Sequence, residues 1–279
     1  MGAQTPAAIS RAILVAVLVM VPALLLPFTK SDTAQMVMIF AVLASVLTFI
    51  EYNSRYPSIV EFRFAPPYNR LRFLTLAAIL ITLSLIIRGE VAPTKATILL
   101  TSLADGLGAA VDFPYSPVGL MVVMLPPDAD PALFAQVRRA AGVSYMASLV
   151  MVLIFLTLVR FHGWPNRGSG FNVWVNMPLF DPTGGGDVVH RIGRDAGLNM
   201  VLGFLLPFII PAMVTLASSI LDPVTITDPH TLIWTTTAWA FLPASLLMRG
   251  IAMSRIAAMI EDKRKRTYTA KGPGTTQGV

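Results

Sequence analysis

The sequence predicts an all-α polytopic membrane protein: a six-helix transmembrane bundle with amphipathic interfacial helices on its outer face and possible short strands in its inner loops. Only 13% of the residues are charged and 55% are hydrophobic, whereas soluble domains carry about 25% charged residues. The charges are missing in six blocks, each about as long as a bilayer is thick. These observations exclude the one or two soluble domains that the length alone would allow.

Six runs of mostly apolar residues are each about long enough to cross the hydrocarbon core, where free backbone groups find no partner. The runs cover residues 13–28, 34–50, 71–87, 143–159, 198–221 and 232–248. Arg11 precedes the first run as it would in a secretory signal, but no small-x-small cleavage pattern follows Phe28, so an uncleaved helix is expected. Residues 1–249 form a single predicted transmembrane domain, and a tail follows over 250–279.

The basic residues predict the orientation, because loops rich in Lys and Arg stay on the cytoplasmic side. With six spans and a cytoplasmic N-terminus, 16 of the 21 Lys and Arg residues lie inside. They are Arg11, Arg72, Arg249 and the basic residues of the inner loops 51–70 and 160–197 and of the tail. We therefore expect a multi-pass protein of the cell inner (cytoplasmic) membrane with both termini in the cytoplasm.

The outer segment, residues 88–142, is where the number of membrane segments is least constrained. Over 96–111, Leu99, Leu103 and Leu107 share one helical face, while Asp105 and Asp112 belong to the other. This pattern predicts a helix that lies in the interface or packs on the bundle.

Two further pieces of the outer segment precede the fourth span. Residues 118–125 form an apolar run too short to cross a bilayer, which predicts a buried strand or a shallow re-entrant dip. Asp130-Pro131 has the form of an N-cap followed by proline at the first helical position. This predicts an amphipathic helix that can run directly into the fourth span.

The inner loops contain two runs with strand-like alternation. Residues 58–64 place Val60, Phe62 and Phe64 on one side, and residues 171–177 alternate in the same way. Two such runs on one side of the membrane could pair into a small sheet.

The tail carries a basic cluster, Lys263, Arg264, Lys265 and Arg266, soon after the sixth span. Such a cluster attracts anionic lipid by about 1 kcal/mol per basic residue, so these side chains are expected to bind lipid headgroups. Residues after about 268 are rich in Gly and Thr and are expected to be disordered.

No catalytic, cofactor-binding or metal-binding residue is predicted. The absence of cysteine excludes disulfides, thiolate metal sites and cysteine nucleophiles. His162, His190 and His230 belong to no HExxH motif, and the glycines at 184–186 precede no Lys-Ser/Thr pair of a phosphate loop. Within the spans, ionisable residues such as Arg249 occur only near the ends, where they can reach headgroups.

The charged residues of the outer segment are candidates for partner docking. Arg138 and Arg139 stand near the start of the predicted helix that leads into the fourth span, and Asp105 and Asp112 are seven residues apart on one helical face. A solvated polar face explains them most simply. They could instead dock a partner, or the two carboxylates could act as an acid/base pair.

These observations favour a non-enzymatic accessory, assembly or scaffold subunit that packs against a larger inner-membrane complex. One alternative is a carrier or flippase for a neutral or lipid-like substrate, with a cavity near Asn199 and Thr215. A second is an interfacial enzyme that uses Asp105, Asp112 or His190. The expected partners are the lipid bilayer and other membrane subunits, without cofactor. No nucleic acid is expected, because no basic run is interleaved with stacking aromatics.

Overall fold

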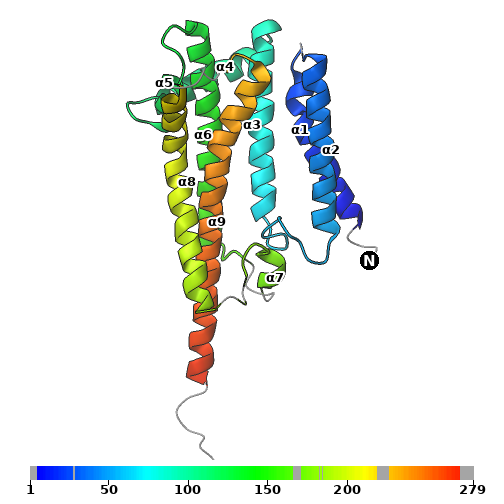
Figure 1. The fold of residues 1–279 in the computed structure, drawn as a ribbon, viewed down its shortest axis with the longest axis vertical. Coiled ribbons are helices and arrows are strands. Elements are labelled where there is room, and N and C mark those ends of the chain that lie inside the picture. The colour runs from blue at the N-terminus through cyan, green and yellow to red at the C-terminus, as the bar shows by residue number, and fades with distance from the viewer. Residues whose placement is uncertain are drawn as a thin grey trace, which may run out of the picture.

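A computed structural model describes residues 5–27, 29–165, 171–181, 183, 185–218 and 226–270. Six long helices run roughly side by side, and short helices cover the two ends (Figure 1). The long helices are α1 (Thr5–Leu25), α2 (Ser31–Asn53), α3 (Tyr68–Val91), α6 (Pro131–Phe161), α8 (Val188–Ser218) and α9 (Pro229–Ala270). The short ones are α4 (Lys95–Val111), α5 (Pro117–Val123) and α7 (Val173–Asn176).

The six long helices are each long and apolar enough to cross a membrane. The predicted helical class and the predicted number of spans are therefore confirmed at this level, and the outer segment 88–142 adds no further helix of this kind. We call the end with α4 and α5 the cap end. The opposite end, with the 54–67 segment and the residues between α6 and α8, is the loop end (Figure 1).

Several helices extend beyond the predicted spans. The spans were predicted from apolar residues alone, whereas the first and last turns of these helices are polar and can lie outside the hydrocarbon core. The α1 helix begins at Thr5, so Arg11 lies inside it. The α6 helix begins at Pro131, and the Asp130 carboxylate accepts a hydrogen bond from the Ala132 N–H at 2.8 Å, which confirms the predicted N-cap. The α9 helix continues to Ala270, past the predicted start of disorder, and 271–279 lie outside the described residues.

The predicted strands are wrong in the described part of the chain. Residues 58–64 form bends and turns, and α7 occupies much of the second run. The reason is the backbone at Phe62, whose φ of 52° is left-handed and reverses the chain, so Phe62 is buried while Phe64 is 53% exposed. The two runs do meet: the backbone N–H of Phe62 donates to the Asn176 carbonyl at 2.6 Å.

Most of the run 118–125 is also helical, since α5 covers it to Val123, where a buried strand or a shallow re-entrant dip was expected. Ser116 caps α5 by accepting a hydrogen bond from the Gly119 N–H at 2.9 Å, and Pro117 occupies the first helical position. This is the same cap-and-proline signal that marked the start of α6. The short apolar run masked it, because a buried helix and a buried strand are equally apolar.

Most of the core lies between α3, α6, α8 and α9, with contributions from α1, α4 and α5. Small residues allow several of these helices to approach closely. A Cβ on Gly142 of α6 would lie 2.6 Å from the Cα of Gly108 in α4. A Cβ on Gly203 of α8 would lie 2.6 Å from the Pro243 carbonyl of α9. Such small-residue contacts are typical of helices packed in membranes, where the lipid is as apolar as the side chains.

Candidate functional site

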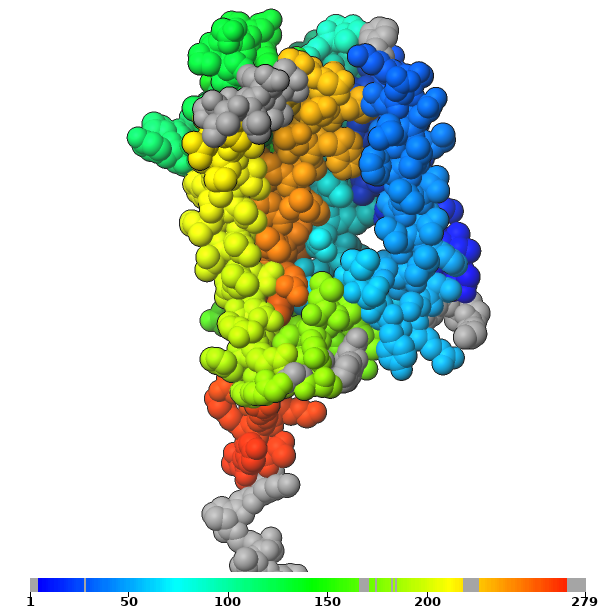
Figure 2. All heavy atoms as spheres, in the orientation of Figure 1, coloured from blue at the N-terminus to red at the C-terminus, as the bar shows by residue number. Residues whose placement is uncertain are grey.

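A recess separates the α1–α2 hairpin from the rest of the bundle. Among the described helices, α2 packs only on α1, and α1 in turn packs on α3 and slightly on α9. Figure 2 shows the resulting hollow between α2 (blue) and α9 (orange), with α3 (cyan) behind it. Only 6% of the most apolar stretch of α2 is buried, against 61% for α9. The hairpin therefore offers its own surface and one side of a recess to lipid or to a partner.

The loop end of the recess is shaped by the Glu51 carboxylate. Glu51 is 5% exposed at the end of α2. It accepts hydrogen bonds from the Ser58 hydroxyl at 2.5 Å and from the backbone N–H groups of Ile59 and Val60, each at 2.9 Å. These bonds fold the following segment back under α2. The neutral donors stabilise the ionised carboxylate, so Glu51 keeps its negative charge beside Arg63.

Three arginines from three segments act on the end of α2 that holds Tyr52: Arg11 of α1, Arg63 of the 54–67 segment and Arg72 of α3. We call them the arginine cluster. All three lie within electrostatic range of the phenol of Tyr52. The Arg11 guanidinium covers the Tyr52 ring at 4.7 Å. It also donates to the Ala7 carbonyl at 3.1 Å, so its side chain turns back towards the N-terminal end of α1.

The other two members of the arginine cluster carry donors without acceptors. Arg63 donates through Nη1 to the backbone carbonyl of Glu51, and burial, more than any neighbouring charge, lowers its pKa. The Arg72 guanidinium lies 5.7 Å from the Tyr68 ring and 5.9 Å from the Phe241 ring. The Nε atoms of Arg63 and Arg72 are both buried, and neither has a hydrogen-bond partner in the described part of the chain.

A second polar centre joins the loop end to the bundle. Arg249 of α9 donates to both carboxylate oxygens of Glu61, at 2.5 and 2.9 Å, and to the Asn199 side chain of α8 at 3.0 Å. The Glu61 side chain is 8% exposed and that of Arg249 22%. Sequence reasoning placed Arg249 among residues that reach headgroups and missed Glu61 altogether. The available signal was a glutamate in the middle of a loop rich in arginine.

The predicted docking residues are brought together at the cap end and are bound to one another. Arg138 pairs with Asp112 at 2.6 Å, and Arg139 pairs with Asp105 at 2.7 Å and with Glu90 at 3.0 Å. These pairs hold α4 against α6. Both carboxylates of the proposed acid/base pair thus have arginine partners within the chain.

The amphipathic α4 helix presents its apolar face outward. Its buried residues are the small or polar Thr97, Ala104 and Gly108. Leu99 and Leu103 are 60% and 58% exposed. A helix that turns leucines away from its own bundle needs an apolar surrounding, as at a membrane interface or a subunit contact.

The remaining predicted site residues stay apart. His190 is exposed at the start of α8, at the loop end, whereas Asp105 and Asp112 lie at the cap end (Figure 1). Asn199 and Thr215 are separated along α8 by about 24 Å at the helical rise of 1.5 Å per residue. The Thr215 hydroxyl donates to the Pro211 carbonyl at 3.0 Å. The two residues therefore lie more than four helical turns apart on one helix.

The tail cluster lies on the last turns of α9. Arg264 pairs with Asp187 at 2.6 Å, and its hydrogen bond is the main cause that lowers the Asp187 pKa. Lys265 pairs with Glu261 at 2.8 Å, one turn earlier. Lys263 and Arg266 line an open groove of about 660 Å³.

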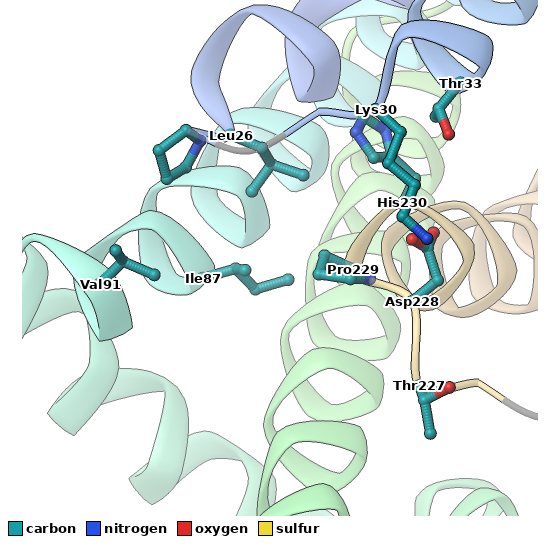
Figure 3. A pocket seen from close by; sticks show the side chains of 10 residues that line it. Leu26, Lys30, Thr33, Ile87, Val91, Thr227, Asp228, Pro229 and His230 are labelled. Carbon is teal, nitrogen blue, oxygen red and sulfur yellow. The ribbon is translucent and has the colours of Figure 1, made fainter.

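A pocket of about 440 Å³ lies at the cap end of the recess (Figure 3). It is lined by the turn between α1 and α2, by the end of α3 and by the start of α9, including Lys30, Asp228 and His230. The His230 Nε2 lies 3.1 Å from the Thr29 hydroxyl, and its Nδ1 is buried without a partner in the described part of the chain. This contact ties the hairpin turn to α9.

The described residues contain no group of three His, Asp or Glu side chains placed to hold a metal ion. Comparisons with protein-family models, with curated protein sequences and with solved structures give no match. The class that the fold defines is that of a helical multi-pass membrane protein, with six helices that length and composition suit to a bilayer. Beyond this class, function rests on the geometry described above.

Proposed function

We propose that this protein is a non-enzymatic accessory, assembly or scaffold subunit of a larger membrane complex, and that the α1–α2 hairpin is its docking element. The observation that carries the proposal is the isolation of α2, which packs on α1 alone among the described helices. Apolar side chains such as Phe40, Leu43 and Leu47 are 53% to 58% exposed on it. The partner that fits this surface is an apolar transmembrane helix of another subunit.

The polar groups within the spans support a packing role. Hydroxyls of several helices donate to the carbonyl one turn earlier, as Thr48 does to Ala44 at 2.7 Å and Ser84 does to Leu80 at 2.6 Å. A hydroxyl used in this way is satisfied within its own helix and is not presented to a substrate.

We further propose that the loop end faces the cytoplasm and that the membrane is the cell inner membrane. The support is the bias of Lys and Arg towards the loops and tail of that end, which insertion into a membrane retains on the cytoplasmic side. The tail residues Lys263 to Arg266 would then meet anionic headgroups.

The decisive experiment compares two triple-alanine variants in gently solubilised, affinity-purified protein. Phe40, Leu43 and Leu47 are replaced on α2, and the control replaces Leu198, Val201 and Phe204, which are similarly exposed on α8. We expect the wild type and the α8 variant to elute in the same larger stoichiometric assembly and the α2 variant to elute alone. A wild type that elutes as a lone monomer, or an α2 variant that stays in the assembly, contradicts the proposal.

A carrier or flippase for a neutral or lipid-like substrate is the second candidate, and the recess in Figure 2 favours it. The recess opens sideways towards the membrane, so a lipid could move along it between the two leaflets. Purified protein in vesicles that contain a fluorescent lipid provides the test. A protein-dependent increase in lipid exchange between leaflets supports the carrier, and equal exchange in protein-free vesicles rejects it.

A further inference from the structure

The apolar side of α4 is uncovered at the cap end. Leu99, Leu103 and Leu107, which we call the leucine face, are 60%, 58% and 40% exposed. Among the described helices, α4 packs on α3, α5 and α6, and the leucine face remains exposed. A face of this kind requires an apolar surrounding, either lipid or another protein. Its depth and its direction distinguish the two.

Two close contacts fix α4 to spanning helices at the same depth. Thr97 of α4 packs on Gly89 of α3, where an added Cβ would lie 2.5 Å from the Thr97 Cβ. Gly108 of α4 packs on Gly142 of α6, where an added Cβ would lie 2.6 Å from the Gly108 Cα. Each of the two spanning helices is contacted within two residues of the cap-end limit of its apolar run. Both contacts therefore lie just outside the hydrocarbon core.

Contacts at equal depth place α4 along the membrane surface. Gly108 follows Thr97 by eleven residues, which is about 16 Å along the helix axis. The α3 and α6 helices run side by side, so equal levels on them define a plane across the cap end of the bundle (Figure 1). Amphipathic helices that lie in such a plane bury their apolar face about 5–10 Å deep, at the boundary between headgroups and acyl chains.

The carboxylates of α4 show which of its sides faces water. Asp105 pairs with Arg139 at 2.7 Å, and Asp112 pairs with Arg138 at 2.6 Å. These arginines precede Gly142 by about one helical turn, so they lie farther from the apolar run of α6 than the glycine contact does. The acidic side of α4 is therefore turned away from the centre of the bilayer.

The leucine face points the opposite way. Leu103 and Leu107 stand two residues before and after Asp105, so each lies about 160° around the helix from it. Seen from the contact at Gly108, Asp105 lies about 60° to one side and Leu107 about 100° to the other. Because Asp105 is on the water side of this contact, the leucines are on the hydrocarbon side. This direction favours lipid, since acyl chains begin at this level.

We propose that α4 is an in-plane membrane anchor, and that Leu99, Leu103 and Leu107 bind the acyl chains of the leaflet at the cap end. The ion pairs with Arg138 and Arg139 keep its carboxylates on the water side. The inference is independent of the subunit role, because a lone monomer would insert α4 in the same way. It is also independent of which end faces the cytoplasm.

Fluorescent probes on single cysteines test the proposal in the full-length protein, which has no cysteine of its own. Leu103→Cys carries the probe on the leucine face. The matched control is Ala109→Cys, an exposed position about 40° around the helix from Asp105. Both are labelled with the same nitrobenzoxadiazole group and placed in phosphatidylcholine vesicles. One quencher is phosphatidylcholine with a nitroxide near the start of its acyl chain, and the other is aqueous iodide.

We expect the nitroxide lipid to quench the probe at 103 about twofold or more strongly than the probe at 109, and iodide to show the reverse preference. Equal nitroxide quenching at the two positions overturns the proposal, as does stronger iodide quenching at 103. A probe at 103 that neither quencher reaches also overturns it, because a second copy of the chain would then cover the leucine face.

A second measurement uses the wild type, because a label at 103 could itself disturb α4. Phosphatidylcholine with a photoactivatable group near the start of its acyl chain is cross-linked to the unlabelled protein in vesicles. Cross-links to the leucine face support the proposal. Cross-links to the spanning helices without any to 95–111 reject it. Since these vesicles contain no other protein, neither result depends on whether the chain belongs to a larger complex.

Discussion

Arg249 and Glu61 form a two-point ion pair, with Nε 2.5 Å from Oε2 and Nη2 2.9 Å from Oε1. The two residues are 188 positions apart in the chain. The third arginine nitrogen, Nη1, donates to Asn199 Oδ1 at 3.0 Å. One guanidinium thus fastens the 54–67 segment to both α8 and α9, and it thereby holds the floor of the recess in place.

Glu61→Gln should destabilise the protein by about 2 to 4 kcal/mol, because it leaves the Arg249 charge without its counter-ion in a poorly solvated place. The residual hydrogen bond to Asn199 and the partial exposure of Arg249 keep the loss below that of a fully buried pair. The measurement is reversible unfolding by sodium dodecyl sulfate in mixed micelles.

The control for this pair is Asp187→Asn, which breaks the exposed pair with Arg264. An exposed pair contributes little, so its loss should not measurably shift the unfolding transition. Similar losses for Glu61→Gln and Asp187→Asn would show that the Arg249 pair is not a structural anchor.

Gly142→Ala should destabilise the packing of α4 on α6 by about 1 to 3 kcal/mol, because backbone cannot yield to the added methyl group as a flexible side chain would. The new Cβ would lie 2.6 Å from the Gly108 Cα. Gly106→Ala is the matched control on α4, since its Cβ would meet nothing within 4 Å. We expect the control to stabilise by up to about 1 kcal/mol through helix propensity. Thermal unfolding of both variants in one detergent measures the difference, and equal midpoints would contradict the close contact.

Arg139→Gln should loosen α4 without unfolding the bundle, because Arg139 of α6 bridges Asp105 of α4 and Glu90 of α3. Hydrogen–deuterium exchange should rise over 95–111 by several fold, corresponding to about 1 kcal/mol for pairs that are partly exposed. The control Asp128→Asn removes an exposed charge at the same end and should leave this exchange unchanged. Unchanged exchange in Arg139→Gln would show that the ion pairs do not hold α4.

Single cysteines should report the proposed orientation, since the chain has none of its own. Tyr115→Cys at the cap end, where Tyr115 is 86% exposed, should react with an impermeant maleimide in intact cells. Thr269→Cys near the end of α9 should react only after permeabilisation. The reverse pattern would place the loop end outside and overturn the assignment from basic residues.

The sequence and the structure agree where a property depends on consecutive residues. An apolar run of spanning length must form a helix in lipid, because no other conformation of a single segment satisfies its own backbone. The cap at Asp130-Pro131 was also predictable, because its hydrogen bond joins Asp130 to Ala132, only two residues away. Prediction was wrong at 58–64, where the left-handed backbone of Phe62 overrode an alternating pattern.

The functional candidates depended on residues far apart in the chain. The leucine face of α4 was visible as a pattern, but its outward direction follows from arginines of α6 that attract Asp105 and Asp112. Likewise, Arg63 and Arg72 were visible only as basic residues of and after an inner loop, without sign that the Nε donor of each would be buried.

The sequence by itself thus determined the helical class, the six apolar helices and the bias of positive charge, because each follows from composition along a short stretch. The tertiary structure decided the pairing of Arg249 with Glu61, the arginine cluster and the isolation of α2. Those depend on how helices pack in three dimensions, and side chains brought together from distant segments leave no periodic trace in the chain.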